Sequence, residues 1–255
     1  MCLILVAWRA HPRYPLIVAA NRDEYHSRPT AAADFWSDRP EVLAGRDLEC
    51  GGTWLGVTRD GRFAAVTNFR DGSTRDPGME SRGSLTRDFL IGAQPPARYL
   101  REVQGRAHRY NGFGLLVGVC RRLLYCTNRD STSLEIGPGF YGLSNHLLDT
   151  PWPKVKRGKT ALAALVVSSP ILDPEALLHL LADDAVAADS QLPDTGVGRE
   201  WERALSAIFV RGEAYGTRAS TVLLIDLAGT VTLSERSFAA GGSPARTVTQ
   251  HFAIA

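Results

Sequence analysis

Short apolar runs separated by turn residues open the chain, and they predict antiparallel hairpins. Leu3–Trp8 and Leu16–Ala20 are apolar runs joined by a segment rich in proline and arginine. Trp54–Thr58 and Phe63–Asn68 flank an Asp-Gly dipeptide at positions 60–61, which is a strong signal for a two-stranded hairpin. We therefore expect the N-terminal region to form strand pairs.

The same pattern continues along the chain, with helices grouped between the hairpins. Further expected strands are Gly112–Val119, Leu123–Thr127, Gly139–Ser144, Ser220–Asp226, Thr230–Glu235 and Thr247–Ile254. Expected helices are Leu85–Leu90, Ala97–Tyr110, Pro153–Val167, a helix capped by Asp173 that runs to about Asp184, and a short one at Arg203–Ala207. This order lacks the regular strand–helix alternation of a doubly wound parallel sheet. It predicts a single α+β domain over residues 1–255 with mostly antiparallel sheets.

Composition and charge narrow the class of protein. The 255 residues are 44% hydrophobic and 22% charged, as in ordinary globular proteins. The net charge of +2 argues against a nucleic-acid partner. Of the 29 basic residues only Lys154, Lys156 and Lys159 are lysines, so 29 − 3 = 26 are arginines, and we attribute this bias to coding sequence.

The N-terminus and the cysteines indicate where the protein works. The apolar run Leu3–Trp8 is too short to span a bilayer and has no basic segment before it. The four cysteines form no zinc or haem-attachment spacing, which favours a reducing compartment with free thiols. We expect a cytoplasmic protein without a transmembrane segment.

Cys2 is a candidate nucleophile. Removal of Met1 would leave a chain that begins with a cysteine carrying both a thiol and a free α-amine. The ordinary pKa values of these groups are about 8.5 and about 7.7–8.0, so one residue would supply a nucleophile and its general base. The alternative is that Cys2 is a buried small residue of the first strand.

Polar residues gather at two strand ends in the first sixty positions. Asn21, Arg22, Asp23 and Glu24 directly follow an apolar strand, at a sheet rim where binding residues often lie. A salt-bridged turn is the alternative interpretation. Trp54 stands in a segment with three glycines, which permit special backbone angles or the close approach of a ligand. The alternative here is a bulge packed against the indole.

Three more polar residues flank later strands. Asn68 ends one expected strand and Asn145 ends another, and carboxamides there are able to donate to a developing oxyanion. They also stabilise turns, which is the structural alternative. Arg218 enters the strand Ser220–Asp226, where it would orient a carboxylate or nucleophile, or pair with an acid on the surface.

Motifs spread over the whole chain resemble one known family. They are Met-Cys at 1–2, AANRDE at 19–24, SRP at 27–29, DFW at 34–36, GGTWLG at 51–56, TNF at 67–69, YNGF at 110–113, YGLSN at 141–145, TPW at 150–152, QLPD at 191–194, YGTR at 215–218 and ERSF at 235–238. With these motifs the chain resembles the NRDE family, which is also the transport and Golgi organisation 2 family.

The resemblance implies a fold and a site. The family is similar to the N-terminal nucleophile (Ntn) hydrolases, which have a four-layer αββα sandwich. Their cysteine branch includes bile salt and penicillin amidases and acyltransferases. By this resemblance the catalytic residues are Cys2, Asp23, Asn68, Asn145 and Arg218. The amidases also use an arginine a few residues before the aspartate, whereas Arg22 here is adjacent to Asp23.

Two functions follow from the resemblance. The first is a hydrolase or acyltransferase that needs no cofactor, in which Cys2 attacks a small amide or acyl ester. The second is a carrier that binds haem, a lipid or an acyl-coenzyme A in the same pocket. His26, His108 and His146 are the histidines considered as haem ligands, although lone histidines are more often structural or exposed. An enzyme of this type requires the free α-amine of Cys2, and a carrier does not.

Overall fold

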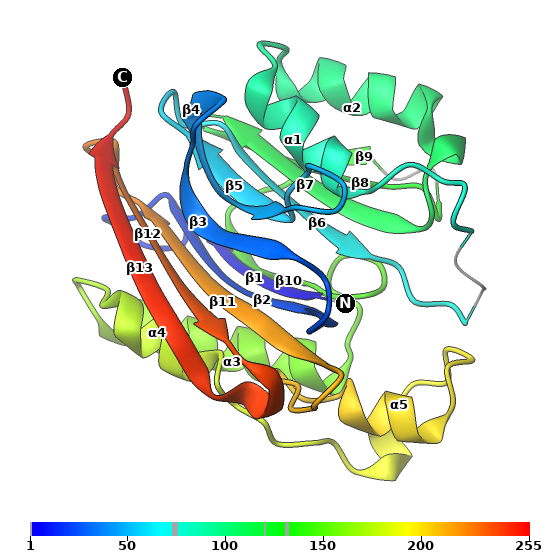
Figure 1. The fold of residues 1–255 in the computed structure, drawn as a ribbon. Coiled ribbons are helices and arrows are strands. Elements are labelled where there is room, and N and C mark those ends of the chain that lie inside the picture. The colour runs from blue at the N-terminus through cyan, green and yellow to red at the C-terminus, as the bar shows by residue number, and fades with distance from the viewer. Residues whose placement is uncertain (1, 73–75, 120, 131–132) are drawn as a thin grey trace.

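Two antiparallel sheets stacked face to face form the centre of the computed structural model, which describes residues 2–72, 76–119, 121–130 and 133–255 (Figure 1). Within these residues the first sheet has six strands, in the order β10 (Gly139–Leu143), β1 (Cys2–Trp8), β2 (Leu16–Tyr25), β11 (Tyr215–Ile225), β12 (Thr230–Phe238) and β13 (Pro244–Ala253). The second has seven, in the order β3 (Thr30–Trp36), β4 (Arg39–Asp47), β5 (Leu55–Thr58), β6 (Phe63–Asn68), β7 (Phe113–Val119), β8 (Arg122–Thr127) and β9 (Ser133–Glu135). Every strand pair is antiparallel, as the sequence predicts.

Helices cover the outer faces of both sheets. The α-helices are α1 (Gly83–Ile91), α2 (Pro96–Gly105), α3 (Pro153–Ser168), α4 (Pro174–Leu180) and α5 (Arg199–Ala204), and the 3-10 helices are η1 (Ala107–Arg109), η2 (Asp189–Gln191) and η3 (Ala240–Gly242). Figure 1 shows α3 and α4 beneath the first sheet and α1 and α2 above the second. Asp173 caps α4 by accepting from the backbone N–H of Glu175 at 2.9 Å, which confirms the expected helix start. Among the helices of the described residues, none has both the length and the apolar sequence needed to cross a membrane.

The strand β1 shows why the chain forms four layers. Successive side chains of a strand point to opposite faces. Ile4 and Val6 therefore pack into the core between the two sheets, whereas Leu3 and Leu5 pack against α3 and α4. A third buried cluster joins α1 and α2 to the outer face of the second sheet. The result is the αββα sandwich that the resemblance implies.

The sequence analysis missed part of the second sheet. It predicted no strand at β3, β4 or β9. It also placed a short helix at Arg203–Ala207, whereas the helix α5 covers Arg199–Ala204. Proline, acidic and small residues interrupt the apolar pattern of β3 and β4, and both strands have exposed or half-buried positions. All three positions of β9 are exposed, so no hydrophobic alternation marks it.

A buried carboxylate links the two sheets. Glu235 in β12 of the first sheet accepts from the backbone N–H of Ala33 in β3 of the second at 2.7 Å. It also accepts from the hydroxyl of Thr221 at 3.1 Å. Burial raises the pKa of Glu235, with the two hydrogen bonds opposing that shift. The ionised form is therefore disfavoured in the fold relative to the unfolded chain.

This linkage predicts a pH-dependent effect of Glu235→Gln. Because the folded pKa lies above the unfolded one, the contribution of Glu235 to stability is complete below the unfolded pKa and is lost as pH rises through the folded pKa. In a glutamine the Oε1 still accepts from Ala33, the Nε2 donates to the Thr221 hydroxyl in place of accepting from it, and the side chain never ionises. The free energy of unfolding of Glu235→Gln minus that of the parent should therefore increase as pH rises from acid to neutral, measured by denaturant titration. The exposed control Glu213→Gln should show no such trend, and a flat difference for Glu235→Gln would contradict the prediction.

Candidate functional site

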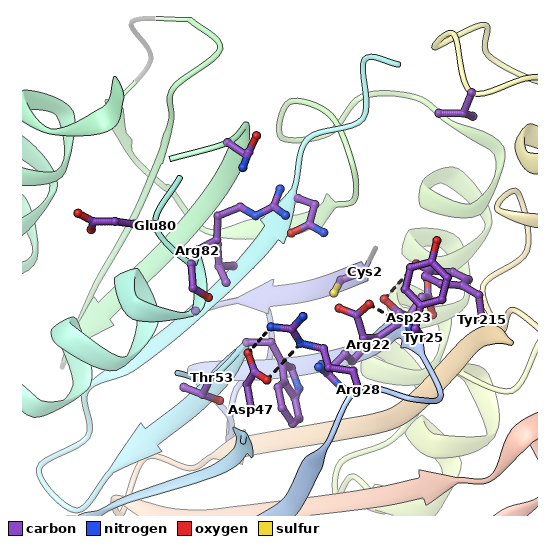
Figure 2. Close-up of a pocket in the computed structure, with 18 of the residues that line it drawn as sticks. Cys2, Arg22, Asp23, Tyr25, Arg28, Asp47, Thr53, Glu80, Arg82 and Tyr215 are labelled. Carbon is purple, nitrogen blue, oxygen red and sulfur yellow. Dashed lines mark hydrogen bonds and ion pairs between the residues drawn. The ribbon is translucent and has the colours of Figure 1, made fainter. Parts of the chain in front are cut away.

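A cavity of about 430 Å³ opens at one end of the sandwich, within the size range of small-molecule sites (Figure 2). Residues from both sheets and from α5 line it. They are Cys2, Arg22, Asp23, Glu24, Tyr25, Arg28, Asp47, Thr53, Trp54, Val66, Asn68, Glu80, Ser81, Arg82, Gly83, Asn111, Val197, Trp201 and Tyr215. Residues far apart in the sequence therefore share one concave surface.

Cys2 begins β1 and is one of the residues that line this cavity. It pairs with Arg22 of β2 in the antiparallel register, which brings the first residues of β1 beside the last residues of β2. Burial raises the pKa of the Cys2 thiol, and the charge of Asp23 raises it further, whereas the charge of Arg22 and the backbone N–H of Asp23 lower it. Cys2, Cys50 and Cys126 are free thiols. Met1 and Cys120 lie outside the described residues.

Asp23 is buried beside the start of β1. Its Oδ1 accepts from the hydroxyl of Thr217 in β11 at 2.7 Å. Its backbone carbonyl accepts from the hydroxyl of Tyr215 at 3.0 Å. Burial raises the pKa of Asp23, and the positive charge of Lys154 in α3 is the largest influence in the opposite direction. Strands β2 and β11 thus hold the carboxylate in a defined position next to Cys2.

Arg22 lies against the wall that the second sheet provides. Its guanidinium stacks over the indole of Trp54, with the carbon 4.3 Å from the ring centroid, and donates to the hydroxyl of Thr30 at 3.1 Å. A Cβ on Gly45 would occupy the space of that indole, so this position requires glycine. Although adjacent to Asp23, Arg22 does line the cavity, because both residues stand at the end of β2.

An ion pair forms part of the cavity wall. Arg28 binds Asp47 through two parallel hydrogen bonds, Nε to Oδ1 at 3.1 Å and Nη2 to Oδ2 at 2.8 Å. Figure 2 shows this pair beside Thr53, while Glu80 and Arg82 lie on the other side of the cavity. The Asp47 hydrogen bond raises the pKa of Arg28 against the effect of burial, so the guanidinium stays charged. Arg28 belongs to the SRP motif, which the sequence analysis quoted without assigning it to the site.

Aromatic rings form a further part of the wall. Tyr215 makes edge-to-face contacts with Tyr25, at 5.1 Å between ring centroids, and with Trp201 of α5, at 5.4 Å. All three rings line the cavity. Such rings provide apolar surface with little conformational freedom to lose on binding.

The two asparagines of the expected site lie one behind the other. Asn68 ends β6 and lines the cavity together with Cys2 and Asp23. Asn145 is fully buried and, among the described residues, is not in the lining. Its side-chain Nδ2 donates to the backbone carbonyl of Asn68 at 3.1 Å, and its backbone carbonyl accepts from the backbone N–H of Arg70 at 2.7 Å. Asn145 therefore holds the strand end that presents Asn68.

Asn21 and Arg218, which we expected in the pocket, are not among its described lining residues. Strand alternation turns Asn21 toward the helical layer, where its Nδ2 donates to the carbonyls of Leu181 and Ile208 at 2.9 and 2.8 Å. A β-bulge lies at Arg218, because the register of β11 with β2 shifts between residues 217 and 219. The guanidinium of Arg218 donates to the carbonyls of Tyr25 and Arg28 at 2.8 and 3.1 Å. These two hydrogen bonds of Arg218 hold the turn that follows β2 in place.

The sequence analysis also missed a buried charge cluster beside the cavity. Arg70 and Glu202 form an ion pair at 2.9 Å with both side chains 3% exposed, and the Arg70 guanidinium stacks over Trp152. Lys154, at the start of α3, is 1% exposed. Only the scarcity of lysine distinguished Lys154 in the sequence, and nothing there indicated that these groups meet.

Comparison with known proteins identifies relatives along nearly the full length. The sequence profile of the family described as "Transport and Golgi organisation 2" matches residues 1–240. The chain is 37% identical over 261 residues to the transport and Golgi organization 2 homolog of Mus musculus, and 38% identical over 257 residues to the human homolog, with 93% of each chain covered in both cases. It is 28% identical over 250 residues to the protein from Drosophila melanogaster, covering 89% of this chain and 88% of the relative.

Solved structures show the same fold at low sequence identity. An ortholog of N-acylethanolamine-hydrolyzing acid amidase from Caenorhabditis elegans superimposes with a TM-score of 0.54 at 11% identity, covering 88% of this chain and 92% of the other. A mutant conjugated bile acid hydrolase from Clostridium perfringens gives a TM-score of 0.52 at 8% identity, covering 100% and 92%. The fold is that of the Ntn hydrolases, which confirms the fold class predicted from the sequence.

Proposed function

The chain belongs to the transport and Golgi organisation 2 family, and we propose that it is a hydrolase or acyltransferase in which Cys2 attacks the carbonyl of a small amide or acyl ester. The observation that carries the proposal is that Cys2, Asp23 and Asn68 line one cavity although they come from three strands of two sheets. A thiol, a carboxylate and a carboxamide so placed are the groups that acyl transfer requires.

The proposed reaction has two stages. The Cys2 sulfur bonds to the substrate carbonyl carbon, and the tetrahedral intermediate expels the amine or alcohol with a proton, leaving an acyl thioester on Cys2. Water or another acceptor then attacks the thioester, releases the acyl group and returns the proton to the sulfur. On a mature chain that starts at Cys2, the α-amine receives and returns this proton.

Surrounding residues take distinct parts in the proposal. Asn68, which lines the cavity, donates to the oxyanion of the intermediate, and Asn145 acts behind it by holding its backbone. Asp23 orients the α-amine, and its own position depends on Thr217. Arg218 acts indirectly, through the turn that carries Tyr25 and Arg28. The aromatic wall accommodates an apolar acyl group, and Arg22 lies where a polar group would bind.

A carrier of haem or of a lipid-like acyl ligand is the second candidate function. It is favoured by the buried state of Cys2, because burial raises the pKa of the thiol and a protonated thiol is a poor nucleophile. The described lining residues include no histidine, so iron would take Cys2, Tyr25 or Tyr215 as a ligand. Such a carrier would hold its ligand without a free α-amine.

Product release from a substrate panel separates the two functions. Parent and Cys2→Ala proteins are incubated with acyl amides, acyl esters and thioesters of increasing chain length, and ligand binding is measured in parallel with haem and with a fatty acyl-coenzyme A. The hydrolase or transferase proposal expects release by the parent alone. No release by a parent shown to start at Cys2, with equal binding by both proteins, would favour the carrier.

A further inference from the structure

One buried cation lies near the proposed site without a part in the reaction above. Lys154 stands in the first turn of α3 with 1% of its surface exposed, and none of the described residues offers its Nζ a hydrogen-bond acceptor. Burying an unpaired ammonium group is unfavourable, and the positive end of the helix dipole adds to the cost. Both burial and the helix dipole oppose a charged group at this position, and such unfavourable placements are typical of functional groups.

The packing of α3 determines where Lys154 lies. The helix packs against β1, and a Cβ on Gly158 would lie 2.8 Å from the side chain of Leu5 in that strand. The glycine therefore permits a close approach of helix and strand. Lys154 stands one helical turn before Gly158. Cys2, three residues before Leu5 in β1, is among the groups that act on it.

The charges that act on Lys154 come from four other elements. Asp23 lies near the end of β2, Cys2 begins β1, Arg70 follows β6 and Glu202 belongs to α5. Burial lowers the pKa of Lys154 to about 8, and Asp23 is the largest influence in the opposite direction. Arg70 lowers the pKa further, whereas Cys2 and Glu202 raise it. Lys154 is thus close enough to respond to the ionisation of Cys2.

The balance of these charges favours one more negative group. Arg70 and Glu202 neutralise each other in their ion pair. Lys154 then faces the carboxylate of Asp23. Arg22 acts on Cys2 and on Glu235, whose raised pKa disfavours the charged carboxylate, which leaves one positive charge in excess. Glu24 and Tyr215 also act on Asp23. Glu24 lies at the half-buried rim where solvent screens its charge, and burial raises the pKa of Tyr215 well above its ordinary value, which keeps the phenol neutral.

We propose that Lys154 is a positioning residue for Cys2 and that its ammonium group balances the Cys2 thiolate and the Asp23 carboxylate in the cavity wall. The ionisation it supports converts the thiol to the thiolate and releases the proton to solvent or to the α-amine. Lys154 makes no bond to the substrate. This inference rests on the proposed function, but the ionisation is measurable without any substrate.

The composition of the chain supports the assignment. Lysine occupies three of the 29 basic positions. Lys156 is exposed and Lys159 pairs with Asp149 at 2.7 Å, so Lys154 is the buried member of the three. An arginine would bring a planar group with five donors that need partners, whereas the ammonium is a compact charge.

The pH profile of Cys2 alkylation tests the inference. Iodoacetamide reacts with parent, Lys154→Met, Lys154→Arg and the exposed control Lys156→Met across a pH series, and peptide mass spectrometry follows each cysteine separately. We expect the midpoint for Cys2 to rise by at least about one pH unit in Lys154→Met. Lys154→Arg should reverse most of that shift because it keeps the charge, and Lys156→Met should match the parent.

Equal midpoints in the parent and in a folded Lys154→Met would overturn the inference. If Lys154→Met does not fold, Lys154→Gln takes its place. If neither variant folds, a shift of about one pH unit or more in the Cys2 alkylation midpoint of Lys154→Arg would overturn the inference. Turnover is measured separately. A shifted midpoint without turnover counts against the proposed function alone, and turnover with an unshifted midpoint counts against the inference alone.

Discussion

Cys2→Ser should lower turnover by at least about 10³-fold while the fold remains intact. The hydroxyl has nearly the shape of the thiol but ionises far less readily, and thiolate character determines the reactivity of a cysteine. Steady-state rates on the best substrate of the panel, together with thermal unfolding, measure the effect.

The matched control for this variant is Cys50→Ser. Cys50 is also a free thiol but is exposed, so the same chemical change there should leave turnover near the parent value. A Cys2→Ser protein whose turnover stays within about tenfold of the parent would show that the thiol is not the nucleophile.

Glu202→Gln should reduce the free energy of unfolding by about 3–5 kcal/mol. Glu202 is the ion-pair partner of Arg70, and both side chains are 3% exposed. Burial already lowers the pKa of Arg70, which Glu202 opposes, and Lys154 lies nearby as a second buried cation. Removing the carboxylate leaves Arg70 buried without its counter-ion and takes one negative charge away from Lys154. The amide oxygen of glutamine still accepts from the backbone N–H of Thr195, so the lost stability is due to the missing charge.

Denaturant unfolding at neutral pH measures this loss against two controls. Glu200→Gln, on the exposed side of α5, should change the free energy of unfolding by no more than about 0.5 kcal/mol. A double variant in which Arg70→Met accompanies Glu202→Leu should recover much of the stability, because an apolar pair replaces the two charges. Equal stability of Glu202→Gln and Glu200→Gln would contradict the argument.

The parts of the fold that could be predicted are those with a local signal. The strands β1 and β2 were predicted because apolar runs end at turn residues, and β5 and β6 because an Asp-Gly turn separates them. The strands β3 and β4 were missed because their residues alternate poorly. Their pairing is decided by contacts with the rest of the sandwich, such as the hydrogen bond of Glu235 to Ala33.

The residues of the candidate site also separate into those with a local sequence signal and those whose position depends on packing. Cys2, Asp23 and Asn68 stand at strand ends and line the cavity, as expected from the motifs. Arg218 was expected there, but a β-bulge turns its side chain to the loop carbonyls, and no residue type in YGTR marks a bulge. Lys154 was overlooked because its contact with the site depends on how a helix packs, which a single sequence does not reveal.

Intact-protein mass spectrometry tests the central claim most directly. The parent, first shown by mass to start at Cys2, is mixed with the thioester and amide panel and quenched in acid within the first turnovers. We predict a mass increase equal to one acyl group, mapped to the Cys2 peptide and absent from Cys2→Ala. A parent that turns over substrate with no acyl mass on Cys2, or that carries it equally on Cys50, would contradict the account.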